Sequence, residues 1–179
     1  MKKKVFTTLA LMAGGIMFAQ AQQNMKPEET EVWTPVPKVV TPGKSCGDAP
    51  SDAVILFDGK NLNQWVLTND TTKQADWIVT DGMITAHPKS GNIQTKQLFT
   101  DYQLHIEWKV PSNITGTGQG RGNSGLFLAS TGKGDDGYEL QIMDSYNNPT
   151  YVNGQAGSIY KQFPPLVNAN FPPGTWQAY

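Results

Sequence analysis

From Ser51 onward, the sequence is a series of short apolar or alternating runs separated by clusters of Gly, Asn, Asp and Pro. Alternation with a period of two is typical of a strand with one buried face, and Gly and Pro clusters are typical of turns. No long stretch spaces its apolar residues with the 3.6-residue period of a helix. The pattern predicts an all-β domain, with strands at 54–57, 77–79, 83–86, 102–110, 124–129, 138–143 and 157–160.

Alternation also sorts the side chains of each run between two faces of a strand. In DYQLHIEWKV, the apolar face carries Tyr102, Leu104, Ile106, Trp108 and Val110, and the polar face carries Gln103, His105, Glu107 and Lys109. In YELQIMD, one face carries Tyr138, Leu140 and Ile142, and the other carries Glu139, Gln141 and Met143. Antiparallel sheets often expose a polar face to water, and a ligand-binding face is the alternative. We expect Trp108, on the apolar face, to belong to the core.

Residues 1–21 have the features of an export signal. MKKK is positively charged, VFTTLALMAGGIMF is apolar, and Ala19-Gln20-Ala21 fits a cleavage site. The apolar run is shorter than the roughly 20 residues of a membrane-spanning helix. We therefore predict a periplasmic or secreted protein with a cleaved signal peptide and no membrane span. Residues 22–50, rich in Pro, Glu, Thr and Lys, are expected to form an extended leader before a single domain at 51–179.

Charge and cysteine content exclude several functions. Loss of residues 1–21 removes three of the 14 basic residues and none of the 15 acidic ones, so the net charge falls from -1 to -4. This balance provides no basic surface for nucleic acid or for an anionic membrane. Cys46 is the only cysteine, which rules out an intramolecular disulfide. Its turn-rich surroundings, GKSCGDAP, favour an inert thiol over a catalytic nucleophile.

Several motifs follow one another along the predicted domain. They are LFDGKNLNQW, the pattern W-x-V-x-DG-x-I at 77–84, TKQLFTDYQLHIEWKV, GRGNSGLFL, GYELQIMDSY and NGQAGSIY. Together, across residues 54–179, they resemble the bacterial 3-keto-disaccharide hydrolase family. The resemblance implies a concanavalin-like jelly-roll β-sandwich that holds a sugar on a curved sheet, and an enzyme that cleaves glycosides already oxidised at C3. Members of the family continue past the GxWQxY motif, so we expect C-terminal strands of the sandwich to be missing here.

The chemistry of a 3-keto-glycoside indicates which groups such a site needs. The ketone makes the C2 proton acidic, because its loss gives an enolate; the glycosidic oxygen at C1 can then leave, and water adds later. This route needs a base at C2, a group that stabilises the enolate oxygen and an acid for the leaving oxygen. It does not need the paired carboxylates of ordinary glycosidases. Direct hydrolysis is the alternative route.

Given the resemblance, the candidate acid and base residues are Glu107, Glu139 and His105. Arg121, between glycines in GQGRGNSG, could stabilise the enolate oxygen, with a solvated loop arginine as the alternative. The other candidates for sugar binding are Asn123, Gln141, Asp144 and Tyr160. Asn123 could instead hold its loop, Asp144 could instead cap the following turn, and Tyr160 could also donate a proton.

Metal binding has little support in the sequence. No HxH, HExxH or paired-cysteine spacing occurs, which argues against a dedicated zinc site. A divalent ion held through Glu139 or Asp144 stays open, and no other cofactor is indicated. The expected partner is a 3-keto sugar or glycan substrate. Two other functions stay open: a lectin-like module without catalysis, because fold does not determine function, and a conventional glycosidase that uses Glu107 and Glu139.

Overall fold

The computed structural model describes residues 26–45, 47–131 and 136–179. The chain divides into two compact units, Met1–Val40 and Thr41–Tyr179. The predicted signal peptide and Cys46 lie outside the described residues. In the described part of the first unit, the 3-10 helix η1 (Pro27–Thr30) is followed by extended chain. The large apolar side chains of this extended chain face solvent: Trp33 is 79% exposed and Val39 is 91% exposed.

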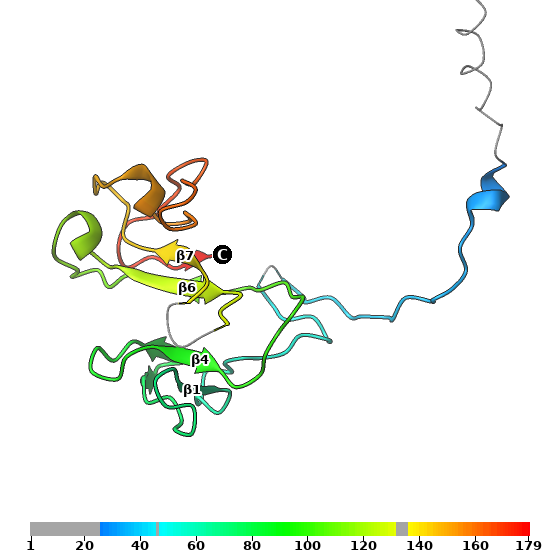
Figure 1. Ribbon diagram of the computed structural model, residues 1–179, viewed down its shortest axis with the longest axis horizontal. Coiled ribbons are helices and arrows are strands. Elements are labelled where there is room, and N and C mark those ends of the chain that lie inside the picture. Colours follow the sequence, from blue (N-terminus) through cyan, green and yellow to red (C-terminus); the bar gives the residue numbers. More distant parts are fainter. Residues whose placement is uncertain (1–25, 46, 132–135) are drawn as a thin grey trace, which may run out of the picture. The chain divides into compact units, whose positions relative to one another are not determined.

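The described part of the second unit is built from short antiparallel strand pairs. β1 (Trp65–Leu67) pairs with β4 (Ile93–Thr95), β2 (Ile78–Thr80) with β3 (Met83–Thr85), β5 (Glu107–Trp108) with β8 (Gln177–Ala178), and β6 (Ser124–Leu128) with β7 (Tyr138–Ile142). Two 3-10 turns, η2 (Gly118–Gly120) and η3 (Val152–Gly154), lie in the loops. Figure 1 shows β6 and β7 side by side. Because the described residues contain no α-helix, the predicted all-β class is confirmed.

Two hairpins agree well with the predicted strands. β6 and β7 begin at the predicted residues, Ser124 and Tyr138, and each ends one residue early. β2 and β3 are joined by Asp81 and Gly82, whose φ angles are both positive, 50° and 73°. An Asp-Gly pair adopts this conformation readily and matches the twist of the two strands. The turn chemistry of the sequence therefore explains this hairpin.

Other strand predictions are wrong in whole or in part. Residues 54–57 form no strand, the run 102–110 is a strand only at Glu107–Trp108, and 157–160 contributes only isolated bridges at Ile159. β1, β4 and β8 were not predicted. A strand requires a hydrogen-bonded neighbour, whereas alternation reports only which side chains share a face. Alternation therefore predicted which segments are extended, but it could not predict which of them pair with a neighbouring strand.

The predicted faces of the run 102–110 are confirmed at its end, whereas Tyr102 and Leu104 at its start are 45% and 37% exposed. Trp108 and Val110 are 7% and 5% exposed, whereas Glu107 is exposed. The Trp108 ring lies 5.5 Å from the ring of Tyr179. Met143, which alternation placed on the polar face, is fully buried in the same cluster. Gln141, two residues earlier on the same predicted face, is also fully buried, so this end of the predicted polar face is covered by other residues.

An apolar groove continues from this core. Its lining residues are Tyr102, Leu104, Ile106, Leu126, Leu128, Leu140 and Tyr179. In the β6–β7 register, Leu126 lies opposite Leu140, so both belong to the apolar face of the hairpin. Glu139 and Gln141 therefore project from the opposite side of β7. We call this opposite side, which carries Glu139 and Gln141, the polar side of the hairpin.

Candidate functional site

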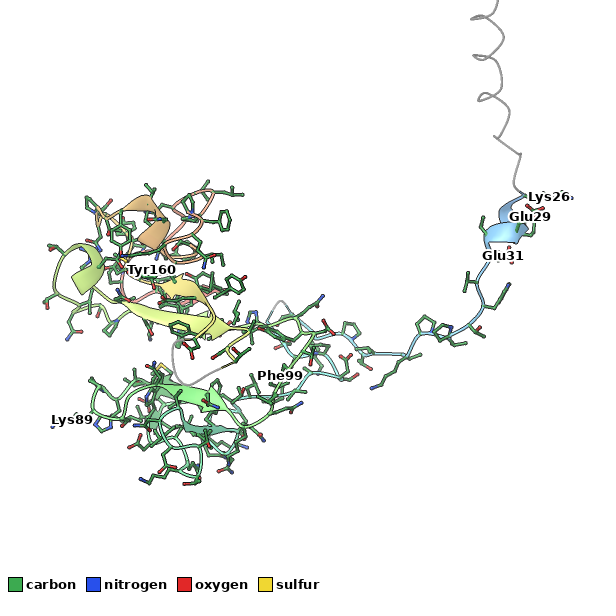
Figure 2. The ribbon with its side chains drawn as sticks, in the orientation of Figure 1. Lys26, Glu29, Glu31, Lys89, Phe99 and Tyr160 are labelled. Atoms are coloured by element: carbon green, nitrogen blue, oxygen red, sulfur yellow. The ribbon has the colours of Figure 1, made fainter. Side chains whose placement is uncertain are left out.

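The segment that follows η3 extends the polar side of the hairpin. It bonds to the free edge of β7, since the backbone N–H of Gln141 donates to Ser158 and that of Tyr160 donates to Glu139. Ile159 lies opposite Leu140 in an antiparallel bridge, so it shares the apolar face. Tyr160, the next residue, consequently lies on the same side as Glu139. Figure 2 labels Tyr160 on this segment.

The Glu139 carboxylate is held in place by two neighbours. A Cβ added at Gly125 would come within 2.9 Å of Glu139 Cδ, so the carboxylate lies across a position that only glycine leaves open. With its amide nitrogen turned toward Glu139, Gln141 donates to Oε1 over 3.1 Å and to the Ser124 carbonyl over 2.7 Å. Gln141 is fully buried. Its contacts thus position Glu139, whereas the sequence suggested that it binds sugar hydroxyls.

Gln119 connects the loops that flank the hairpin. Its amide nitrogen donates to the Gly154 carbonyl and to Thr150 Oγ1, both over 2.9 Å. Asn123 donates to the Gln119 backbone carbonyl over 3.1 Å and to the Gln119 side-chain oxygen over 3.2 Å. Asn123 therefore holds the loop, which is one of its two predicted roles. Gln119 was missed, although it belongs to the GQGRGNSG motif.

Arg121 and Asp144 form an ion pair away from Glu139. Arg121 Nε lies 2.7 Å from Asp144 Oδ2, and the guanidinium also donates to the Tyr146 carbonyl. Asp144 is 2% exposed, and its Oδ1 accepts the backbone N–H of Tyr146 over 3.1 Å. Asp144 thus caps the turn, one of its predicted alternatives. Because this carboxylate neutralises Arg121, the guanidinium is a poor candidate for the enolate stabiliser.

His105 and Glu107 form another group of candidates. His105 Nε2 lies 3.6 Å from Glu107 Oε1, and both side chains are more than half exposed. A Cβ added at Gly47 would lie 3.6 Å from Glu107 Oε1, so the 41–51 loop approaches this pair. The predicted sharing of one strand face by His105 and Glu107 is confirmed. The contacts of Glu139 described above, with Gly125 and Gln141, involve neither residue of this pair.

Two further residues on the polar side were not predicted. The Tyr151 hydroxyl is hydrogen-bonded to the Tyr160 hydroxyl, and the two ring centroids are 6.2 Å apart. Lys161 Nζ lies 5.4 Å from the Tyr151 ring centroid and 5.7 Å from that of Tyr160. The hydrogen bond to Tyr160 raises the pKa of Tyr151 to about 12, with a smaller effect from the negative charge of Glu139. Tyr151 is therefore a neutral phenol at physiological pH.

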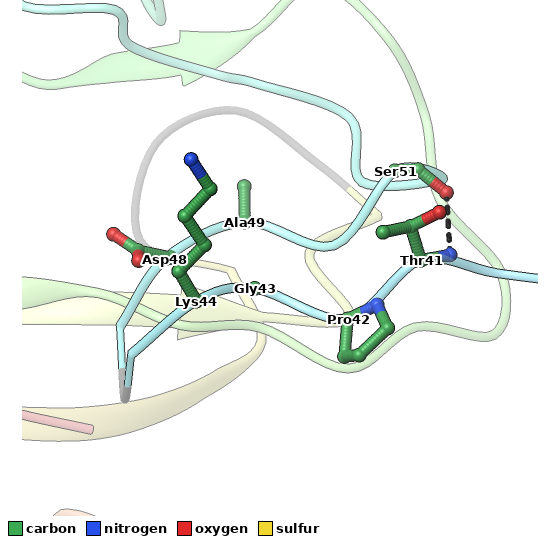
Figure 3. Close-up of a pocket in the computed structure, with 7 residues that line it drawn as sticks. All are labelled: Thr41, Pro42, Gly43, Lys44, Asp48, Ala49 and Ser51. Atoms are coloured by element: carbon green, nitrogen blue, oxygen red, sulfur yellow. Dashed lines mark hydrogen bonds between the residues drawn. The ribbon is translucent and has the colours of Figure 1, made fainter.

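The loop between Thr41 and Ser51 encloses an open depression. Figure 3 shows its lining residues, Thr41, Pro42, Gly43, Lys44, Asp48, Ala49 and Ser51. Ser51 Oγ accepts the backbone N–H of Thr41, and Asp48 accepts the N–H and the hydroxyl of Ser45. These bonds explain the local turn, in agreement with the turn-rich sequence. They leave the depression with few groups suited to sugar recognition.

A metal site finds no support in the part of the chain that the structure describes. That part contains no group of three or more His, Cys, Asp and Glu side chains placed to bind an ion. Both Asp144 oxygens are engaged by Arg121 and Tyr146, so Asp144 does not suit the divalent ion that the sequence left open. Within the same residues, none of the helices has the length and apolarity needed to cross a membrane.

The fold and the polar side of the hairpin define an all-β domain that gathers a carboxylate, an amide and two phenols on one side of a strand pair. The family model of the 3-keto-alpha-glucoside-1,2-lyase-like domain matches residues 52–179. The chain belongs to this family, as its motifs suggested.

The chain is also similar to a solved structure, that of a candidate glycosyl hydrolase from Parabacteroides distasonis ATCC 8503. The two are 53% identical with a TM-score of 0.77, which supports the predicted concanavalin-like jelly-roll β-sandwich. The match covers 86% of this chain and 64% of that one, so this chain spans less than two thirds of its relative. Among curated proteins, none matches the sequence.

Proposed function

We propose that the protein cleaves the glycosidic bond of 3-keto-glycosides, such as 3-keto-disaccharides, after export to the periplasm or the exterior. The observation that carries the proposal is the fixed position of Glu139 on the polar side of the hairpin. Gln141 holds its carboxylate across Gly125, and two phenols lie on the same side. A positioned base next to hydroxyl groups suits proton abstraction from a sugar.

In the proposed reaction, Glu139 removes the proton at C2, and the electrons of the C2–H bond form an enolate on the ketone at C3. The enolate then reforms the ketone and makes a C1–C2 double bond as the C1–O bond breaks. The leaving oxygen receives a proton, which the Glu139 carboxylic acid can return. Later addition of water across C1–C2 makes the net result a hydrolysis. No oxidant or second substrate is required before that addition.

The test compares matched 3-keto and unoxidised disaccharides, incubated with the purified protein in heavy water and followed by mass spectrometry. We expect cleavage of the keto substrate alone, with deuterium at C2 of the recovered keto sugar beyond the enzyme-free exchange. Binding without cleavage would leave the lectin-like module as the better description. Cleavage of the unoxidised sugar would instead favour a conventional glycosidase.

Two variants test the choice of base. Glu139→Gln keeps the shape of the side chain and removes the base, so kcat should fall on the order of 1,000-fold while binding persists. Asp101→Asn, an exposed change elsewhere in the domain, is the control. If Glu107→Gln abolished turnover and Glu139→Gln did not, the base would belong to the His105–Glu107 pair.

A further inference from the structure

The proposed reaction places a negative charge on the enolate oxygen, and the structure limits which cation can meet it. Arg121, the cation suggested by the sequence, is paired with the buried carboxylate of Asp144. Lys161 differs, because its ammonium group has no carboxylate within ion-pair distance among the described residues. Its side chain is exposed. An exposed ammonium without a carboxylate partner is available to an anionic ligand atom.

The backbone holds Lys161 on the polar side of the hairpin. Its φ angle is 60°, in the left-handed region that side chains other than glycine seldom adopt. Its N–H donates to the Asn153 carbonyl over 2.8 Å, which ties the turn to η3. The ammonium group lies within 6 Å of the rings of both Tyr151 and Tyr160, the usual range of a cation–π contact.

The Tyr151 ring, beside the Lys161 ammonium group, packs against Gly154. A Cβ added at Gly154 would come within 2.7 Å of Tyr151 Cδ2, so the ring packs on bare backbone. The carbonyl of Gly154 in turn accepts from Gln119, which ties Gly154 to η2. Tyr151 is nevertheless 41% exposed, so its hydroxyl end is open to a ligand. The phenol pair is therefore fixed at one end and accessible at the other.

We propose that Lys161, together with the hydrogen-bonded Tyr151–Tyr160 pair, binds the C3 oxygen of the substrate and stabilises the enolate formed there. The proposal rests on the proposed function, in which Glu139 removes the C2 proton. A neutral phenol donates a hydrogen bond to an enolate oxygen, and its partner phenol strengthens that donor by polarising it. An ammonium adds the opposite charge. The base Glu139 and the groups that bind the C3 oxygen then lie on the same side of the sheet. This arrangement suits the substrate, because C2 and C3 are neighbouring atoms of one sugar ring.

The test measures kcat/KM and the rate of C2 hydrogen–deuterium exchange with a 3-keto-disaccharide. Lys161→Met should lower both about 100-fold, the usual cost of losing one oxyanion donor. Tyr151→Phe should lower both by a factor on the order of 10 to 100, since Tyr160 retains its hydroxyl. Lys89→Met and Tyr138→Phe are the matched controls, because both side chains are exposed away from the polar side. Figure 2 labels Lys89 in the turn between β3 and β4.

The exchange rate separates this role from a structural one. A role in folding would lower the unfolding midpoint, whereas loss of the oxyanion group slows exchange with an unchanged midpoint. Activity of Lys161→Met and Tyr151→Phe equal to that of the controls would overturn the inference and leave the proposed function standing. If the unmodified protein failed to cleave or exchange 3-keto-disaccharides, the proposed function itself would fall, and this inference with it.

Discussion

Single side chains determine whether the Glu139 carboxylate stays where a base is needed. Gly125 leaves open the space that the carboxylate occupies, and Gln141 holds it from the buried side. Neither residue is a candidate for chemistry itself. Their positions illustrate how a catalytic group depends on neighbours that lock its rotamer.

Gly125→Ala tests this dependence. The new methyl group would displace the carboxylate, which is the movable end of a side chain, so stability should change little while kcat/KM falls on the order of 100-fold. Gly120→Ala is the control, because a Cβ there meets nothing within 4 Å. Steady-state kinetics and thermal unfolding of both variants provide the comparison. Equal activity of the two variants would show that the position of Glu139 is unimportant.

The raised pKa of Tyr179 predicts that the free energy of unfolding falls at alkaline pH. Burial raises its pKa to about 12, against 10.0 for an ordinary tyrosine. Below pH 10 the phenol is protonated in both states; as the pH rises toward 12 the unfolded state loses the proton first, so the free energy of unfolding falls. Tyr179→Phe should flatten this fall, and should cost about 1 kcal/mol at neutral pH through the lost bond to the Gln141 carbonyl.

Urea titrations at several pH values measure this effect, with Tyr138→Phe as the exposed control. Tyr151 titrates in the same window, so the informative quantity is the difference between the variants. Identical pH profiles for Tyr179→Phe and the unmodified protein would show that Tyr179 does not cause the alkaline fall in the free energy of unfolding.

The loops around β6 and β7 are joined by ion pairing and side-chain amides as well as by backbone ladders. Arg121, just before β6, reaches Asp144, just after β7, and Gln119 links η2 to η3. These contacts fix the ends of the hairpin that carries Glu139. The loops are consequently part of the support of the site.

Removing Arg121 should weaken this support. Arg121→Ala leaves the Asp144 carboxylate buried without its cation, which should lower the free energy of unfolding by about 3 kcal/mol. Lys73→Ala, which removes the exposed partner of Asp70, should have no measurable effect. Chemical denaturation of both variants checks the difference. A large loss of activity in Arg121→Ala with unchanged stability would argue instead that Arg121 contacts the substrate.

The two units of the chain should differ in their importance for stability. The described leader exposes Val32, Trp33, Val36 and Val39, each at least 79% accessible, so its removal uncovers little apolar surface. We expect deletion of residues 22–40 to leave the unfolding midpoint within about 1 °C and kcat unchanged. Calorimetry and kinetics on the two forms test this. A drop of several degrees would mean that the leader supports the domain.

The sequence by itself determined the all-β class, the faces of β7 and of the end of the run 102–110, and the family. Period-two alternation follows from strand geometry alone. It therefore correctly placed Trp108 in the core, and Glu139 and Leu140 on different faces of β7. The turn at Asp81 and Gly82 also has a local cause, because an Asp-Gly pair readily adopts two positive φ angles. Strand pairing could not be read in this way, because the hydrogen-bonding partners of β1, β4 and β8 come from distant parts of the chain.

Only the tertiary structure decided which polar groups work together. Arg121, a reasonable cation by motif, is neutralised by Asp144, and Lys161, which no motif singled out, lies over two phenols. Gly125 and Gly154 make room for Glu139 and Tyr151 through contacts that sequence spacing does not encode. The physical reason is that side-chain chemistry is local to a residue, whereas charge compensation and packing depend on which residues the folded chain brings within a few ångströms.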